Sequence, residues 1–505
     1  MLELPDFAPL RVTRSRRALS SSALASLDHL LIIGTKRTGS RALQRFPQGR
    51  QLFALLARAL ERGEDCASTR ASNARATGIT VAAFSPGATF ASLTWARKVV
   101  AACVRDGPAT LGLVIAGAVS DADARAACAA LIAAAAAAAF ELPTFKTTDA
   151  SPRRLRSLRL LGATPSIDLD EVLAQALGNN VARWFTALPP NVLDAAAYRD
   201  ALERLAAAHG LRYRFSGERE LRKLGAGAFL AVSQGNPNRD AGIVKLSYRP
   251  PRDKHAALAL VGKGIIFDTG GTNLKPFKSM LDMHIDMQGS AVALGALLAL
   301  AALEVPFGVD AWLAISENRL SGNAYKSQDV VYASNGTSIQ VIHTDAEGRM
   351  VLADTLALAS RAQPRLIVDY ATLTGACITA LTDRYSGVFT NRESANADLV
   401  QAGARSGERV WPFPMDDDYD EMLKSDVADI KQCSQESEGD HIAAARFLQR
   451  FVPREIPWVH VDMSAGQHKG GLAHVPSEIT GFGVALTLEL LRESTPAELA
   501  ERWSA

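Results

Sequence analysis

The sequence predicts an α/β fold in two parts: a smaller N-terminal α/β domain, then a larger C-terminal α/β domain with a mainly parallel sheet covered by helices. Three observations predict this fold. The chain has 505 residues, more than one ordinary domain contains. Short apolar runs alternate with helical stretches along its whole length. In the second part these runs are rich in β-branched residues, which is typical of strands buried on both faces.

The N-terminal part contains several candidate strands separated by alanine-rich helical stretches. The run AACAALIAAAAAAAFELP (126–143) is weakly apolar, and we expect a packed alanine helix there rather than a membrane span. The stretch GATPSIDLDE (162–171) resembles a connector, so we place the domain border near residue 165, giving domains 1–165 and 166–505. The candidate strands are LDHLLIIG (27–34), GITVAAF (78–84), ATLGLVIAG (109–117) and RLRSLRLLG (154–162).

Five apolar runs after the border are expected to form strands of the large sheet, with helical stretches between them. Active sites in such sheets lie beyond the carboxyl ends of the strands, so polar residues that follow a strand are candidates for function. The expected strands are HAALALVG (255–262), VDAWLAIS (309–316), SIQVIH (338–343), PRLIVDY (364–370) and PWVHVDM (457–463), and the expected helices are 172–188, 290–303 and 350–362.

The composition is that of a globular protein in a reducing compartment. Hydrophobic residues make up 48% of the chain and charged residues 21%, and the net charge of +2 indicates no partner by itself. The five cysteines are scattered and form no CxxC pair, which argues against a disulfide framework and a thiolate zinc site. Charges interrupt the first residues, so we expect neither a signal peptide nor membrane attachment, and a cytoplasmic location.

The first 62 residues are more basic than the rest, with eleven arginines and lysines against four acids. A solvated basic face explains this excess, and a nucleic-acid surface is the alternative that stays open.

Three segments have unusual polar content just past an expected strand. The first, LVGKGIIFDTGGTNLKP, contains Lys263, Asp268 and Lys275. The second, MLDMHIDMQGSA, places Asp286 before an expected helix. The third, HTDAEGRMVLAD (343–354), has acids and an arginine at alternate positions: Asp345, Glu347 and Arg349.

Each segment also has a purely structural explanation. The glycines of the first segment lack the order of a phosphate-binding loop. TDAE fits a helix capping box, with Thr344 as the N-cap and Glu347 reaching back to it. Asp286 alone would be an acid favoured at a helix N-terminus, and the two lysines alone would lie on the surface.

Taken together, the segments would bring four acids and two lysines into one crevice. Carboxylates crowded there repel one another and lose hydration, so cations must accompany them. Lys263, Lys275 and Arg349 would neutralise them in part. Divalent metal ions would do so better, and carboxylates that bridge two ions are a recurrent hydrolytic design. Gly270, Gly271 and Gly348 would allow the backbone to approach such a cluster.

These segments resemble the leucyl aminopeptidases, also called cytosol aminopeptidases, a family of two-metal exopeptidases. The resemblance covers roughly residues 170–490. It rests on HTDAEGRMVLAD (343–354), where the family has NTDAEGR, and on VGKGIIFDTGGTNLKP (261–276) followed by MLDMHIDMQG (280–289). Further family-like segments are AVSQGN (231–236), SENRLSGNAYKSQDVV (316–331), DYATLTGA (369–376) and SDVADIKQ (425–432).

The resemblance implies a site for two divalent ions of zinc, manganese, magnesium or cobalt, with Asp268 and Glu347 bridging them. It implies Lys275 and Arg349 as the catalytic pair, where Lys275 polarises the scissile carbonyl and Arg349 holds a bicarbonate proton shuttle. The substrate's free α-amine would bind one ion, and water activated by both would attack. Lys263 can be a ligand only as the neutral amine, which requires a depressed pKa beside the ions. The implied metal ligands are Lys263, Asp268, Asp286, Asp345 and Glu347.

The resemblance also implies a substrate pocket for leucine-like side chains, with Leu373 near the anion. Met283 in that pocket could equally be plain core, since methionine fills gaps readily. The implied pocket residues are Met283, Thr372, Leu373 and Gly375. His343 stands where the family has asparagine, and we expect it to orient its loop. Asp440 and His441 stand where small residues are expected, so the substrate preference of this chain is open.

The sequence thus favours a metal-dependent aminopeptidase that acts on peptides with a free N-terminus, with a homohexamer implied by the resemblance. A two-metal phosphoesterase is a second enzyme hypothesis, and the scarcity of histidines in the three segments argues against it. A DNA-binding or regulatory protein on a peptidase scaffold is the alternative of a different class, because some bacterial family members bind DNA. For the N-terminal domain, a role in assembly or regulation is open.

Overall fold

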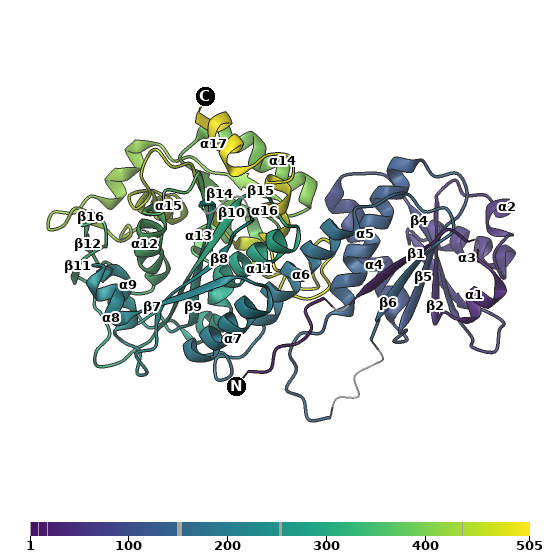
Figure 1. Ribbon diagram of the computed structural model, residues 1–505, viewed down its shortest axis with the longest axis horizontal. Coiled ribbons are helices and arrows are strands. Elements are labelled where there is room, and N and C mark those ends of the chain that lie inside the picture. The colour runs from purple at the N-terminus through teal and green to yellow at the C-terminus, as the bar shows by residue number, and fades with distance from the viewer. Residues whose placement is uncertain are drawn as a thin grey trace. The chain divides into compact units, whose positions relative to one another are not determined.

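The computed structural model describes residues 2–8, 10–17, 19–148, 154–251, 255–436 and 438–504. The chain forms two compact units. One consists of Asp6–Ala176 with Lys469–Glu478, and the other of Met1–Pro5, Leu177–His468 and Ile479–Ala505. The border between the two units falls within helix α6 (Leu169–Thr186). Both units are α/β structures, as the sequence predicts, and each is described by itself below (Figure 1).

The N-terminal unit is built on a six-stranded sheet of order β1-β6-β5-β2-β4-β3, in which only β3 pairs antiparallel. The predicted runs correspond to β2, β4, β5 and β6. Strands β1 and β3 have few apolar residues and were not predicted. The elements are β1 (Arg11–Ser15), α1 (Ser21–Ala25), β2 (His29–Thr35), α2 (Ser40–Leu43), α3 (Gly49–Glu61), β3 (Cys66–Arg70), β4 (Gly78–Phe84), α4 (Thr89–Val104), β5 (Thr110–Ile115), α5 (Asp121–Ala139) and β6 (Ser157–Leu161).

Strand β2 shows why its run is apolar without alternation. Leu30 and Ile32 belong to the core on the α3 side of the sheet, and Leu31 and Ile33 to the core under α4 and α5. Since successive side chains point to opposite faces, a strand covered on both faces must be apolar at every position. Figure 1 shows these helices on the two sides of the sheet.

One segment of the N-terminal unit comes from far along the chain. Residues Lys469–Glu478 belong to this unit, and Ala473 lies in the core under α4 and α5. The backbone oxygen of Ala473 accepts a 3.0 Å hydrogen bond from Nε of Arg97 on α4. Nothing in the local sequence of this segment indicates that membership.

Among the described residues, two helical stretches, Asp121–Ala139 and Met283–Ala302, are long and apolar enough to cross a membrane. One of them is the alanine helix α5, for which the sequence predicts a packed helix rather than a membrane span. Within the apolar window of each stretch, 67% and 83% of the residues are buried inside the protein. Burial in a core accounts for the apolar character of both.

The C-terminal unit is built on an eight-stranded sheet of order β15-β14-β17-β13-β9-β10-β8-β7. The central strands β17, β13, β9 and β10 are mutually parallel, and antiparallel pairs occur toward both edges. The strands and their bounds are β7 (Arg212–Gly217), β8 (Gly242–Tyr248), β9 (Ala256–Asp268), β10 (Gly308–Asn318), β13 (Leu366–Ala371), β14 (Ser386–Thr390), β15 (Val410–Pro412) and β17 (Trp458–Asp462).

Helices cover both faces of this sheet (Figure 1). One face carries the core that includes residues of α9, α12 and α15. On the other face, α11 packs so closely that a Cβ atom on Gly289 would lie 2.1 Å from the backbone oxygen of Tyr370 in β13. The helices are α7 (Ala195–Ala208), α8 (Glu218–Lys223), α9 (Gly227–Ser233), α10 (Phe277–Met280), η1 (Met283–Met287), α11 (Gln288–Ala302), α12 (Glu347–Ser360), α13 (Gly375–Leu381), η2 (Thr382–Arg384), η3 (Glu393–Ala395), α14 (Asn396–Ser406), η4 (Asp417–Leu423), α15 (Asp440–Gln449), η5 (Ser464–Gly466), α16 (Val484–Leu490) and α17 (Pro496–Ser504).

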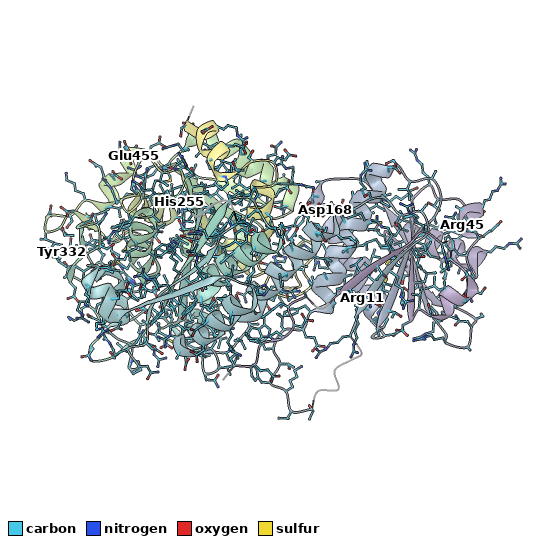
Figure 2. All side chains as sticks on the ribbon, in the orientation of Figure 1. Arg11, Arg45, Asp168, His255, Tyr332 and Glu455 are labelled. Atoms are coloured by element: carbon cyan, nitrogen blue, oxygen red, sulfur yellow. The ribbon has the colours of Figure 1, made fainter. Side chains whose placement is uncertain are left out.

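The run SIQVIH is not a strand of the large sheet, contrary to the prediction. Only Ser338–Gln340 is extended, as β12 of a three-stranded sheet with β11 (Val330–Tyr332) and β16 (Ile430–Lys431). β12 pairs antiparallel with β11 and parallel with β16. This small sheet leads directly into the segment that carries Asp345, Glu347 and Arg349. Tyr332, labelled in Figure 2, lies at its outer side and is 65% exposed.

Candidate functional site

The carboxyl ends of the parallel strands β9, β10, β13 and β17 lie at one edge of the sheet, and the predicted polar residues gather there. Asp268 ends β9, and Lys275 follows it in the next loop. Asp286 lies in η1, just before α11, as predicted. Glu347 and Arg349 lie in the first turn of α12. Lys263 differs from the prediction, because it lies within β9 and not beyond its end.

Lys263 is buried at the centre of the cluster. Its Nζ atom lies 2.7 Å from Oδ1 of Asp286 and 2.9 Å from Oε1 of Glu347. It also donates a 2.9 Å hydrogen bond to the backbone oxygen of Thr372. Burial lowers the pKa of Lys263, but the charges of Asp286, Glu347 and Asp268 raise it by more, so the pKa lies above its usual value. The side chain is therefore an ammonium ion when only these residues face it.

Lys275 forms a second pair of contacts beside the first. Its Nζ atom lies 2.6 Å from Oδ1 of Asp345 and 2.9 Å from Oδ2 of Asp268. Gly270 and Gly271 have φ angles of 85° and 65°, and this left-handed turn brings Lys275 back toward the end of β9. Because its neighbours are carboxylates, the pKa of Lys275 lies above its usual value although burial opposes this.

The carboxylate of Asp268 is oriented by a residue that the sequence analysis did not single out. Asn318, at the end of β10, donates a 2.8 Å hydrogen bond to Oδ1 of Asp268 and a 3.0 Å bond to the backbone oxygen of Thr344. The backbone N–H of Gly270 donates to the same oxygen of Asp268. The position of Asn318 in the segment SENRLSGN, directly after an expected strand, is the sequence signal for it.

The segment 343–349 is held by contacts other than the capping box. Helix α12 begins at Glu347, and no side chain caps its N-terminus. Thr344 Oγ1 donates to the backbone oxygen of Gly270, so the capping interpretation of TDAE is wrong. His343 Nδ1 accepts the backbone N–H of Asp345 at 3.2 Å. The side chain of Gln432 accepts from the N–H groups of residues 342 and 343 and donates to the oxygen of residue 346.

The acids of the cluster have the properties of metal ligands. Oxygen atoms of Asp268, Asp286 and Glu347 all lie within 4.8 Å of one another. Within the described part of the chain, Oδ2 of Asp286 and Oε2 of Glu347 are buried without a hydrogen-bond partner. Burial raises the pKa of Asp286 and of Glu347, and Lys263 opposes this in both. Buried anionic oxygens without partners leave coordination positions that a hard divalent cation would satisfy.

Arg349 lies behind these acids and faces another carboxylate. Its Nη2 atom donates to Oδ1 and Oδ2 of Asp440, at 2.9 and 3.0 Å. Burial alone would lower the pKa of Arg349, but Asp440 outweighs it, and the pKa lies above its usual value. His441, the neighbour of Asp440, packs edge-on against Phe413 with ring centres 4.4 Å apart.

A cavity of about 350 Å³ opens at this cluster. The four residues implied for a substrate pocket, Met283, Thr372, Leu373 and Gly375, all line it together with Lys263 and Lys275. A separate hollow lies at the amino ends of the strands, where His255 and Glu455 are labelled in Figure 2. The cluster of Asp268, Asp286 and Glu347 lines the first of these two cavities.

Asp462, at the end of β17, is a second residue missed by the sequence analysis. It is 1% exposed and lines the same cavity. One of its oxygens accepts from the N–H groups of Leu373 and Thr374, at 3.2 and 3.3 Å, and the other accepts from Thr374 Oγ1 at 2.6 Å. It thereby holds the loop after β13. Its place at the end of the run PWVHVDM was an available signal.

Residues 180–488 match the model of the cytosol aminopeptidase family, catalytic domain. The chain is similar to the probable cytosol aminopeptidase of Syntrophotalea carbinolica, with 41% identity over 323 residues; the match covers 63% of this chain and 64% of that protein.

Solved structures match nearly the whole chain. A mutant of tomato leucine aminopeptidase superposes with a TM-score of 0.83 and 25% identity, covering 95% of this chain and 96% of the other. The bottromycin maturation enzyme BotP in complex with Mn superposes with a TM-score of 0.77 and 30% identity, covering 92% of this chain and 99% of the other.

Proposed function

The chain belongs to the cytosol aminopeptidase family, and on this premise we propose that it is a metal-dependent aminopeptidase that removes the first residue, of leucine-like character, from peptides. The observation that carries the proposal is the cluster of Asp268, Asp286 and Glu347 beside Lys275, at the mouth of a cavity in the carboxyl edge of the sheet. Buried carboxylate oxygens without hydrogen-bond partners fit the coordination of divalent cations.

The metal ligands in this proposal are the buried acids and one amine. Two ions, of zinc, manganese, magnesium or cobalt, would supply the Lewis acidity that polarises the scissile carbonyl and acidifies the attacking water. The manganese complex of the similar protein BotP supports a divalent ion of this kind. Lys263 would have to give up its proton to serve as a ligand, and its pairs with Asp286 and Glu347 would then be lost. The ligand set is Lys263, Asp268, Asp286, Asp345 and Glu347.

Lys275 is proposed as the residue that stabilises the negative charge developing on the carbonyl oxygen. It lines the cavity, its side chain is 13% exposed, and its carboxylate neighbours keep it protonated. A protonated, partly dehydrated amine at that place is worth far more in the transition state than in water.

The proposed pocket for the substrate's first side chain consists of Met283, Thr372, Leu373 and Gly375. Their place in the wall of a cavity of about 350 Å³ supports the assignment. The wall that Met283 and Leu373 provide is apolar and adaptable, which favours leucine-like side chains.

The residues around Arg349 do not fit the bicarbonate ion that the family resemblance implies. The carboxylate of Asp440 already forms an ion pair with the guanidinium of Arg349. No step of the proposed reaction uses bicarbonate, and the role of Arg349 is to fix this region of the site.

The proposal is tested with purified, metal-loaded chain and leucyl p-nitroanilide. We expect hydrolysis of this substrate, none of its N-acetylated form, and none of a phosphomonoester. Lys275→Ala should lower kcat about 10²- to 10³-fold, the usual loss for one donor to a developing oxyanion. Lys223→Ala, at an exposed lysine of α8 that does not line the cavity, is the matched control and should change kcat little. A loaded protein that cleaves no aminoacyl amide rules the proposal out.

Membership of the family supports three further proposals. The chain would assemble as a homohexamer, it would lie in the cytoplasm, and its N-terminal unit would act in assembly or regulation. Light scattering of the purified chain measures the first. The comparisons do not favour the alternative of a DNA-binding protein on a peptidase scaffold, and a gel-shift assay at several salt concentrations would test it.

A further inference from the structure

Arg349 and Asp440 form an ion pair between two helix beginnings that are 91 residues apart in sequence. Arg349 is 2% exposed and lies in the first turn of α12. Its Nη2 atom donates to both oxygens of Asp440, and Nη1 donates to the backbone oxygen of Gln432 at 3.4 Å. Only Nε of this guanidinium lacks a partner among the described residues.

The chain around Asp440 is shaped to present this carboxylate. Gly439 has a φ of 67°, a left-handed conformation that lets α15 begin at the next residue. Asp440 is the first residue of α15, and its side chain is 27% exposed. Acids are favoured at this end of a helix, but here both oxygens also contact the guanidinium of another helix. The family pattern expects a small residue at this place, which could not provide a charge.

We propose that Asp440 takes the place of bicarbonate as the anion of Arg349, so that this chain needs no external anion for its reaction. The inference rests on the proposed aminopeptidase function. Asp440 is a positioning residue, because it acts on the reaction through Arg349.

The charges around Arg349 support the replacement of bicarbonate by the Asp440 carboxylate. One guanidinium balances one carboxylate, and Asp440 already supplies that carboxylate at hydrogen-bond distance. A bicarbonate ion at the remaining Nε donor would have the Asp440 carboxylate as its neighbour on the same guanidinium. Like charges so close in a site of low dielectric constant repel strongly, which opposes binding of the second anion.

The first experiment compares hydrolysis by the zinc-loaded full chain and by Asp440→Gly in CO2-free buffer, with and without added bicarbonate. We expect the natural chain to change its kcat less than about twofold on addition, since its anion site is already filled. Asp440→Gly should lose about tenfold or more in CO2-free buffer, the loss typical of one charged hydrogen-bond partner, and should regain activity with bicarbonate. Glu438→Gln, an exposed acid two residues earlier, is the matched control and should behave as the natural chain.

The second experiment measures bicarbonate binding by isothermal titration and does not depend on turnover. Asp440→Gly should bind bicarbonate at least about tenfold more tightly than the natural chain. The double variant Asp440→Gly, Arg349→Met should lack this increase in affinity. Asp440→Asn keeps the side-chain volume and should bind bicarbonate more tightly than the natural chain even if the glycine variant does not fold.

Three results would overturn the inference: a natural chain that requires bicarbonate, an Asp440→Gly variant as active as the natural chain without it, and variants of Asp440 that gain no bicarbonate binding. If no variant cleaves any aminoacyl amide, the proposed function fails. The titration would still decide whether Asp440 excludes the anion.

Discussion

A Cβ atom added to Gly348 would lie 2.5 Å from Cε of Lys263. The second residue of α12 thus touches the lysine at the centre of the acid cluster through bare backbone. Lys263 cannot move aside freely, because Asp286 and Glu347 hold its Nζ atom.

Gly348→Ala should therefore displace Lys263 and weaken the metal site. We expect metal affinity to fall about 10- to 100-fold, the usual loss when the support of a ligand is disturbed, with kcat falling in parallel. Metal content after dialysis and hydrolysis of leucyl p-nitroanilide measure the two effects. Gly322→Ala is the matched control, since a Cβ there would meet nothing within 4 Å. Equal metal content in both variants would contradict the argument.

Removal of metal should destabilise the C-terminal unit. Without ions, Oδ2 of Asp286 and Oε2 of Glu347 have no hydrogen-bond partner among the described residues, and the two carboxylates repel one another. Ions that bind only the folded chain stabilise it by mass action, by about 2.7 kcal/mol at a hundredfold excess over Kd. Scanning calorimetry should show a higher Tm with zinc or manganese than with a chelator. A Tm that is indifferent to both ions would count against the cluster as a metal site.

Asp462 is predicted to set substrate affinity through the loop after β13. Asp462→Ala leaves the N–H groups of Leu373 and Thr374 without an acceptor, which costs about 1–3 kcal/mol for buried groups. We expect KM for leucyl p-nitroanilide to rise about tenfold with a smaller change in kcat. Asp462→Asn retains an acceptor oxygen and should recover most of the affinity. Equal KM values for both variants would show that the loop holds its place by other contacts.

His29 should make the stability of the N-terminal unit depend on pH. Burial lowers the pKa of His29 from 6.5 to about 4, and its Nε2 lies 2.8 Å from Thr80 Oγ1 in the adjacent strand. The unfolded chain binds the proton at the higher pH, so the stabilisation from neutral His29 is complete above pH 6.5 and is lost as the pH falls toward 4. The loss amounts to about 3 kcal/mol.

His29→Gln cannot titrate and should lack this part of the pH dependence. Proteolysis of the N-terminal unit at several pH values would compare the variant with the natural chain. Identical pH profiles would mean that His29 does not titrate in this window.

The elements best predicted from sequence were those buried on both faces. GITVAAF coincides with β4. The predicted strand HAALALVG (255–262) overlaps the first part of β9, and PRLIVDY (364–370) overlaps β13. Burial on two sides requires an apolar residue at every position, so the signal is strong. Edge strands such as β1, with the sequence RVTRS, bury few side chains, so their sequences lack a continuous apolar run.

The candidate site was predicted as a set of residues, and its internal contacts were not. The acids, Lys263 and Lys275 could be placed together from sequence, because the carboxyl ends of parallel strands lie side by side. The hydrogen bonds of Asn318 and Asp462 and the pair of Arg349 with Asp440 depend on how distant loops pack. Asp369, which accepts from Trp458 and contacts His460 at 2.6 Å in the adjacent strand, likewise depends on strand order.

The late segment Lys469–Glu478 has a consequence for how the chain matures on the ribosome. The N-terminal unit cannot complete its core until Ala473 has been synthesised, when more than nine tenths of the polypeptide has been made. A fragment that stops at Ala176 lacks this segment, so the apolar surface beside α4 that Ala473 covers would stay open to water for most of translation.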